Sequence, residues 1–196
     1  MKIKDPCGSR QMDMQACPLG SLPAEIRTER LLLSPLGPQY VKSAFVYSGD
    51  LENTKFMLDL PEESIEETQE FLKKAEAEWQ KEFPEFYEFA ILTEGAHIGS
   101  VCLYLNEDRT EGELGWILNK RYWGHGYTFE AAQALIDYAS QNLGIKKFIA
   151  YCDSENIPSY SLMEKLGMSR VLCRSGRKNR SSSEERMEYK YALTIE

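Results

Sequence analysis

The sequence predicts a single α/β (α+β) domain: a mixed, mostly antiparallel sheet with helices on both faces. Two apolar runs, Phe86–Thr93 and Ile98–Leu105, are joined by a short turn containing Gly95, as in an antiparallel hairpin. Further along, a strand, a glycine turn, a helix and a strand follow in the order of a βαβ unit, which requires a parallel strand pair. A length of 196 residues favours one domain.

The composition narrows the class of partner. A hydrophobic content of 42% and a charged content of 28% are ordinary for a globular chain. The net charge of −8 argues against nucleic acid or an anionic membrane as a partner, and it is compatible with a cationic acceptor such as an amine. Five cysteines without C-x-x-C spacing predict reduced thiols and no metal site. Because Asp5 and Pro6 stand where a signal peptide needs its apolar core, we expect a cytoplasmic location.

The N-terminal half supplies the first strand and two helices. Residues 1–24 lack periodicity and predict a loosely ordered extension, so that the domain spans residues 25–196. Ile26–Leu33 is predicted as a strand, and Gln39–Tyr47 as a short helix. Pro61–Lys81 is predicted as a longer helix that begins with a capping box.

Four glutamates crowd the start of this longer helix. They form either an acidic patch for a basic substrate or a solvated helix face, the ordinary role of such residues. The four are Glu62, Glu63, Glu66 and Glu67.

The central stretch combines a strand, a glycine turn and a helix. Glu113–Leu118 is the predicted strand, and the helical spacing begins at Phe129 and stops at Gly144. Between them lies the R-x-x-G-x-G turn Arg121–Gly126, whose exposed N–H groups at a helix start favour a phosphate or pyrophosphate. The alternative is a glycine-rich connection that binds nothing. A P-loop is absent, and so is the third glycine of a dinucleotide fingerprint.

The C-terminal part completes the sheet. A strand at Lys147–Cys152, a helix at Tyr160–Leu166 and a strand at Met168–Cys173 are predicted in this order. Arg174–Glu184 is predicted as a polar, basic loop, and Arg186–Thr194 as a last strand that pairs back as an edge hairpin.

Three motifs in this order resemble one enzyme family. They are E-L-G-W-I-L at residues 113–118, R-Y-W-G-H-G-Y at residues 121–127 and E-N-I-P-S-Y-S-L-M-E-K-L-G-M at residues 155–168. Together they resemble the GNAT superfamily of N-acetyltransferases, and within it the RimJ/RimL-like branch, over about residues 28–193. The resemblance implies an acetyl-CoA-dependent N-acetyltransferase, either a monomer or a homodimer. It would acetylate the primary amine of a protein N-terminus or of a small molecule.

The resemblance also implies where acetyl-CoA binds. The parallel strands Glu113–Leu118 and Lys147–Cys152 would splay apart around the pantetheine, and Asn156 would either bind that arm or cap the next helix. The basic loop would either approach the 3′-phosphate of CoA or an acidic substrate, or stay solvated. The implied cofactor-binding residues are the strand residues Trp116, Ile117 and Leu118, the loop residues Arg121, Gly124, His125, Gly126, Tyr127 and Thr128, and Asn156.

The same comparison suggests the reacting groups. Glu113 matches the glutamate of the branch's central strand and is the candidate base. Many members use a tyrosine as proton donor where this chain has Met163, so Ser159 is the candidate donor, with Tyr160 or water as alternatives. Cys152 as a covalent acyl carrier is a further alternative. The missing tyrosine also leaves open a catalytically silent acyl-CoA-binding module, and a glycine turn alone leaves open an unrelated phosphate-binding domain.

Overall fold

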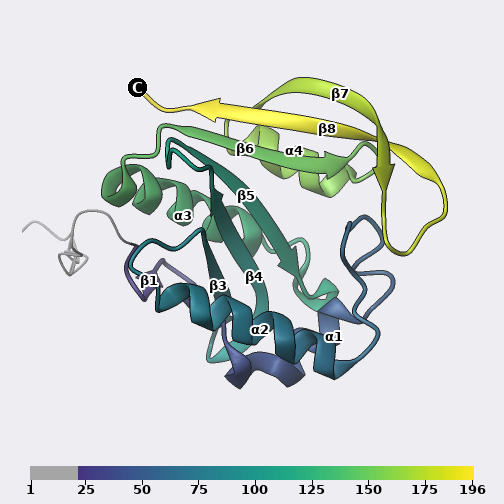
Figure 1. The fold of residues 1–196 in the computed structure, drawn as a ribbon, viewed down its shortest axis with the longest axis horizontal. Helices are drawn as coiled ribbons and strands as arrows, with labels where there is room; N and C mark the ends of the chain where they lie inside the picture. The colour runs from purple at the N-terminus through teal and green to yellow at the C-terminus, as the bar shows by residue number, and fades with distance from the viewer. Residues whose placement is uncertain (1–21) are drawn as a thin grey trace, which may run out of the picture.

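The computed structural model describes residues 22–196, which form eight strands, four α-helices and two short 3₁₀ helices (Figure 1). In chain order these are β1 (Ile26–Arg27), β2 (Leu32–Pro35), η1 (Pro38–Tyr40), α1 (Val41–Ser48), α2 (Ile65–Trp79), β3 (Phe86–Thr93), β4 (Ala96–Leu105), β5 (Glu111–Leu118), η2 (Lys120–Tyr122), α3 (Tyr127–Leu143), β6 (Lys147–Asp153), α4 (Ile157–Lys165), β7 (Ser169–Lys178) and β8 (Glu185–Thr194).

All eight strands belong to one sheet, in the order β1-β2-β3-β4-β5-β6-β8-β7. Neighbouring strands are antiparallel except for β5 and β6, which are parallel, as the βαβ unit requires. The predicted mixed, mostly antiparallel sheet is therefore confirmed. The C-terminal hairpin does lie at the edge, with β8 paired to β6 and β7 outermost.

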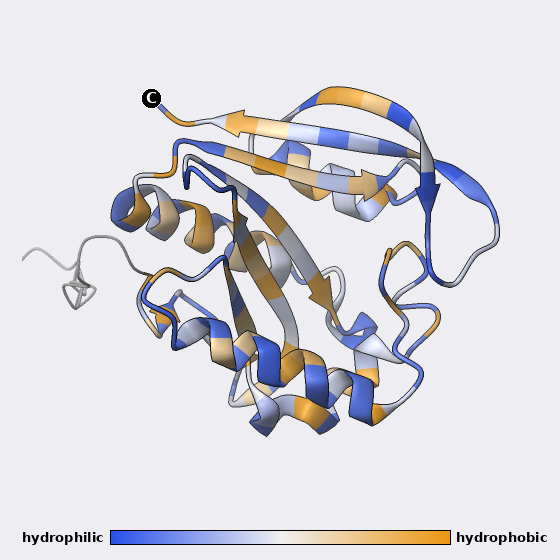
Figure 2. Cartoon of the chain, viewed as in Figure 1, coloured by the Kyte–Doolittle hydropathy of each residue, from blue (hydrophilic) through white to orange (hydrophobic). Residues whose placement is uncertain are grey.

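Helices cover both faces of the sheet, and the alternation of side chains along the strands explains how (Figure 1). In β3, Tyr87 and Phe89 belong to the large core that includes the buried residues of α3 and α4. Ala90, on the other face, packs in a smaller core with residues of α1 and α2. Figure 2 shows the apolar segments along the inner strands, whereas the hairpin end of β7 and β8 is mostly hydrophilic.

The parallel pair of strands separates after a short contact. Only three register pairs join β5 to β6, from Glu111–Lys147 to Glu113–Ile149. Both strands continue beyond this point, to Leu118 and Asp153 respectively. The sheet is consequently open between the C-terminal parts of β5 and β6, at the place where the sequence resemblance implies a splay.

Several element boundaries differ from the predicted ones. The predicted first strand is two short strands, because the chain turns between them and Thr28 holds the turn through hydrogen bonds with Leu31. Strand β7 extends to Lys178 into the predicted loop, with Gly176 at a positive φ of 98° where the register shifts. Residues 1–21 of the predicted extension lie outside the described residues, and Leu22 is buried in the core. Among residues 22–196, no helix has the length and apolar character needed to cross a membrane.

Candidate active site

The glycine turn between β5 and α3 has the backbone of an anion site. Gly124 and Gly126 have φ values of 80° and 78°, in the left-handed region that favours glycine. Gly126 is the N-cap of α3, a helix of 17 residues, and its carbonyl accepts the first helical bond from Glu130. The amides of Tyr127 and Thr128 therefore start the helix without partners inside it, and the helix dipole adds partial positive charge there.

A brace from the N-terminal strands fixes this turn. The Arg30 side chain donates to the carbonyl of His125 at 2.9 Å and pairs with Glu130 at 2.6 Å. Its guanidinium also lies over the Tyr127 ring, and the His125 ring stacks on that tyrosine. Arg121 is exposed beside the turn, where its charge can reach a bound anion. The turn is thus held in shape from both sides and faces solvent.

The open edge of β5 presents the predicted pantetheine residues. Trp116 and Ile117 lie beyond the last rung shared with β6. The carbonyl of Leu118 already accepts hydrogen bonds from Trp123 Nε1 at 2.8 Å and from Asn53 Nδ2 at 3.1 Å. Leu118 therefore has its N–H, rather than its carbonyl, available for a ligand.

Across the opening, α4 begins with Asn156 as its N-cap. The Asn156 side-chain oxygen accepts from the N–H of Ser159 at 3.3 Å, which is the capping role weighed from the sequence. Its amide group can still donate to a ligand. Met163 is fully buried in the core, so the usual tyrosine position carries no hydroxyl that could reach the site. Burial raises the pKa of Cys152 to about 11, which keeps its thiol protonated and argues against a covalent acyl carrier.

A cavity of about 620 Å³ opens on the α1–α2 face of the sheet, next to β5. We call it the acceptor cavity. Its size is typical of small-ligand sites. Its wall contains aliphatic and aromatic side chains together with carboxyl groups from the sheet and from the start of α2. The residues that line it include Leu36, Met57, Leu58, Phe71, Leu72 and Ile117, and the polar residues Glu62, Glu67, Glu88, Cys102, Tyr104, Glu113 and Arg180.

Two cross-strand rows form the floor of the acceptor cavity. In one row Glu88 lies opposite Cys102, and Cys102 lies opposite Gly115. In the next row Tyr104 lies opposite Glu113. A Cβ at Gly115 would lie 2.6 Å from the sulfur of Cys102, so a larger residue there would displace the floor. The sequence thus places two glutamates on the same side of the sheet, one row apart.

Different surroundings give these two glutamates different pKa values. Glu88 is 4% exposed, and burial raises its pKa to about 7, opposed by hydrogen bonds from Cys102 and Tyr104. Glu113 is exposed, and loss of part of its hydration still raises its pKa, with Lys190 opposing the shift. Among residues 22–196 Glu113 forms no ion pair, whereas Glu111 on the same strand pairs with Lys147.

The glutamates at the start of α2 belong partly to the acceptor cavity. The Glu62 carboxylate accepts hydrogen bonds from the hydroxyls of Ser48 and Thr68, which are both buried. The Glu67 carboxylate accepts from the N–H of Glu63 and approaches Arg180 at 3.4 Å. The expectation of a merely solvated helix face is therefore wrong for Glu62, because the chain before α2 turns it inward.

Residues 50–60, which we call the bridging loop, connect the two sides of the opening. On the β5 side, the Asn53 side chain accepts from the amide of Lys120 at 2.7 Å, and Asp50 pairs with the Lys120 ammonium at 2.9 Å. On the hairpin side, Arg177 donates to the carbonyl of Phe56 at 2.8 Å. The loop thereby spans from the end of β5 to the β7–β8 hairpin.

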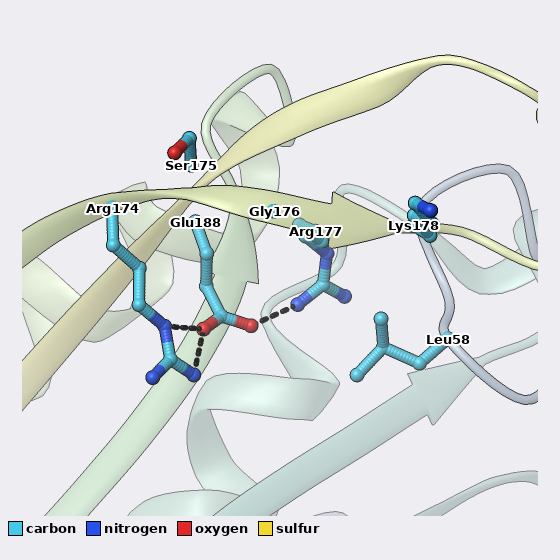
Figure 3. Close-up of a pocket in the computed structure, with 7 residues that line it drawn as sticks. All are labelled: Leu58, Arg174, Ser175, Gly176, Arg177, Lys178 and Glu188. Carbon is cyan, nitrogen blue, oxygen red and sulfur yellow. Dashed lines mark hydrogen bonds and ion pairs between the residues drawn. The ribbon is translucent and has the colours of Figure 1, made fainter.

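Arg177, which holds the hairpin side of the bridging loop, comes from the predicted basic loop. Arg177 is 8% exposed and pairs with Glu188 at 2.9 Å, while Arg174 pairs with the other oxygen of the same carboxylate (Figure 3). These residues line a smaller hollow of about 320 Å³ under Leu58. The expectation of a solvated basic loop is wrong for Arg177, because β7 continues through it and turns its side chain into the protein.

Glu88 is the residue that reasoning from the sequence missed. Its signal is a single carboxylate inside the apolar strand F-Y-E-F-A-I-L, at a position where the period of two points it away from Tyr87 and Phe89. A charge in the middle of such a strand is costly to bury unless it has a partner or a task. This cost is the feature of the sequence that could have identified Glu88 as a candidate site residue.

The chain resembles known proteins over most of its length. Residues 30–169 match the acetyltransferase (GNAT) domain family. A Bacillus subtilis protein described as the uncharacterized N-acetyltransferase YnaD is 31% identical over 147 residues, which are 74% of this chain and 82% of that protein.

Solved structures share the fold. An acetyltransferase of the GNAT family from Bacillus anthracis superimposes with a TM-score of 0.74 at 27% identity, over 87% of this chain and 98% of the other. The ribosomal L7/L12 α-N-protein acetyltransferase RimL, solved with coenzyme A, superimposes with a TM-score of 0.76. Its identity is 16%, over 89% of this chain and 97% of the other, so that likeness concerns the fold alone.

Proposed function

Because the chain belongs to the acetyltransferase (GNAT) domain family and is an acetyl-CoA-dependent N-acetyltransferase, we propose that a primary amine in the acceptor cavity attacks the thioester directly. The observation that carries this proposal is the position of the cavity. Its floor includes Glu113, the last residue of β5 that pairs with β6, so the cavity meets the opening of the sheet at the start of the splay.

The cofactor-binding residues follow the same path. The amides of the turn at Gly124, Gly126, Tyr127 and Thr128 would hold the pyrophosphate, with Arg121 and His125 beside them. The open edge of β5 at Trp116, Ile117 and Leu118, together with the Asn156 amide, would hold the pantetheine. This path leads from the start of α3 along β5 towards Glu113. It supports placing the acetyl group at the rim of the acceptor cavity.

We assign the proton transfers to groups on the two sides of the opening. Glu113 is exposed to the cavity and would accept the proton that the amine nitrogen loses when it bonds to the carbonyl carbon. Ser159, in the first turn of α4, is the candidate donor to the departing sulfur, with Tyr160 or water as alternatives. Ser159 lies beyond the C-terminal end of β6 whereas Glu113 pairs near its start, so a proton from Ser159 would reach the sulfur through water.

The lining of the acceptor cavity favours a cation as acceptor. It has carboxyl groups on the floor and on the α2 side, and Arg180, the arginine that lines it, is already near Glu63 and Glu67. An ammonium group entering the cavity would meet complementary charge. A protein N-terminus and a small-molecule amine both satisfy this requirement.

An acceptor screen tests the proposal. The protein is incubated with acetyl-CoA and a panel of peptides with free α-amines and of small primary amines, and release of free CoA is measured. We expect amine-dependent release with at least one acceptor. Saturable acetyl-CoA binding without turnover on any amine would instead support the silent acyl-CoA-binding module.

A further inference from the structure

The buried carboxyl of Glu88 has no task in the reaction as described so far. It lies in the middle of β3 on the floor of the acceptor cavity, and the hydroxyl of Tyr104 donates to its Oε1 at 3.3 Å. Its side chain forms no ion pair within residues 22–196. A buried carboxyl without a cation destabilises a fold when it is ionised, so its presence beside a ligand cavity calls for a chemical role.

The depth of the two floor glutamates differs. Glu88 is almost fully buried on β3, in the row of Cys102 and Gly115, whereas Glu113 is exposed on β5 at the last rung shared with β6. An amine that fills the cavity and reaches a thioester at the opening would have Glu88 on its cavity side and Glu113 at the opening.

We propose that Glu88 accepts the first proton of the acceptor, taken from its ammonium form before the attack, while Glu113 accepts the second proton, released from the nitrogen after the attack. This assignment rests on the proposed function. It gives each glutamate one proton to handle.

Burial explains why Glu88 suits the first step. A low-dielectric cavity disfavours both the carboxylate and the ammonium, so it raises the pKa of the one and lowers the pKa of the other. Transfer of a proton from the ammonium to Glu88 leaves two neutral groups, which the buried site accommodates best. The ionisable and charged groups that share this cavity with Glu88 are Tyr47, Asp59, Glu62, Glu67, Cys102, Tyr104, Glu113 and Arg180.

The bonds and protons balance as follows. The ammonium gives one proton to the Glu88 carboxylate, and the nitrogen lone pair forms the N–C bond to the acetyl carbonyl carbon. The nitrogen then gives its second proton to the Glu113 carboxylate. The C–S bond breaks with its electron pair on sulfur, which takes a proton from water or from Ser159 that water reprotonates. Both glutamates return their protons to solvent after the amide product leaves.

The experiment compares Glu88→Gln with Glu113→Gln across pH. The acceptor is a peptide with a free α-amine that the screen identifies as a substrate, and the pKa of this amine is about 8. At pH 7 about a tenth of this amine is neutral, so Glu88→Gln should lower kcat/KM about tenfold. Above pH 9 the neutral amine is abundant, and Glu88→Gln should approach the parent. Glu113→Gln should stay slow at both pH values, because its proton is released only after the attack.

Three controls make the result decisive. Glu88→Asp keeps a titrating carboxyl and should retain more activity at pH 7 than Glu88→Gln. Glu70→Gln changes an exposed glutamate of α2 and should behave as the parent. A melting curve at each pH shows that every variant is folded, and the recovery of Glu88→Gln at high pH is an internal measure of an intact site.

Two outcomes would overturn the assignment. Parent-like activity of Glu88→Gln at pH 7 would show that Glu88 takes no proton. An equal loss of activity at pH 7 and above pH 9 would show that Glu88 shapes the cavity without handling a proton. A parent protein that releases no CoA with any amine would instead overturn the proposed function itself, and the role of Glu88 with it.

Discussion

At the scale of single residues, the glutamates that line the acceptor cavity have different surroundings although their side chains are chemically identical. Glu88 and Glu113 lie one cross-strand row apart, yet one is buried and the other is exposed. Glu62, on the wall, is held by the hydroxyls of Ser48 and Thr68. Burial therefore raises the pKa of both Glu88 and Glu113, whereas the position of Glu62 is fixed by its two hydroxyl partners.

Replacement of Glu113 tests the base assignment. Glu113→Gln keeps the size of the side chain and removes the proton acceptor, so kcat should fall by about 10²–10⁴ while acetyl-CoA affinity is unchanged. Ser159→Ala should lower kcat less, because water can protonate a thiolate. Glu111→Gln, on the same strand, is the matched control, since Glu111 pairs with Lys147 outside the cavity. Full turnover by a stable Glu113→Gln protein would reject the assignment.

The raised pKa of Glu88 predicts a pH-dependent effect on stability. Below about pH 4.5, the ordinary value, Glu88 is protonated in both the folded and the unfolded chain and has no effect. Between about pH 4.5 and 7 only the unfolded chain loses the proton, so the free energy of unfolding falls as pH rises, by about 3 kcal/mol in total.

Glu88→Gln should remove this loss. The variant should therefore be more stable than the parent at pH 8 by about 1–3 kcal/mol, with a smaller difference or none at pH 4.5. Denaturant titrations at the two pH values measure the difference. A change in stability that is independent of pH would contradict the burial of an ionisable carboxyl as its cause.

At the scale of elements, the start of α3 depends on backbone conformation more than on side chains. Gly126→Val should raise the energy of the left-handed N-cap by about 1–2 kcal/mol and weaken acetyl-CoA binding by disturbing the N–H groups of the turn. Gly95, in the β3–β4 turn, has nearly the same φ, at 80°, and open space around it. Gly95→Val should therefore lower stability similarly without changing acetyl-CoA affinity, which calorimetry can compare. Equal affinities for both variants would remove the turn from the cofactor site.

The bridging loop depends on one buried arginine. Arg177→Met leaves the Phe56 carbonyl and part of Glu188 without a donor, so it should lower the free energy of unfolding by about 3–5 kcal/mol. Amides of residues 54–60 should then exchange faster with solvent. Arg174→Met loses the other, exposed half of the same ion pair and should change stability by about 0–1 kcal/mol. Similar exchange in both variants would show that Arg177 does not hold the loop.

The elements were predictable where the local pattern decides them. The capping box at Ser64, the hairpin turn at Gly95 and the stop at Gly144 gave the correct helices and strands, because each depends on neighbours in sequence. The acceptor cavity was not predictable in this way. Its lining brings together Glu62, Glu88 and Arg180, which are far apart in sequence. Their common position depends on strand register and on the course of the bridging loop.

At the scale of the whole molecule, ligand binding should stabilise the fold selectively. At a concentration of about 100 times its dissociation constant, acetyl-CoA should add about 2.7 kcal/mol, or about 5–10 °C in Tm for a chain of this size. ATP and NAD should add little, because the proposed site continues beyond the pyrophosphate into the opening between β5 and β6. Thermal melts with each ligand make the comparison. A Tm that acetyl-CoA leaves unmoved would contradict the cofactor site.

The three rungs between β5 and β6 also determine how the molecule bends. Seven register pairs join β4 to β5 and seven join β6 to β8. The two halves of the sheet on either side of the opening are therefore joined by a much shorter contact than the strands within each half. We expect the sheet to bend most easily at this short contact, in the direction that widens or narrows the opening. The bridging loop is hydrogen-bonded both to the end of β5 and to the β7–β8 hairpin, so it should limit how far the two halves of the sheet separate. Such a bend would change the width of the opening in which the proposed cofactor site lies.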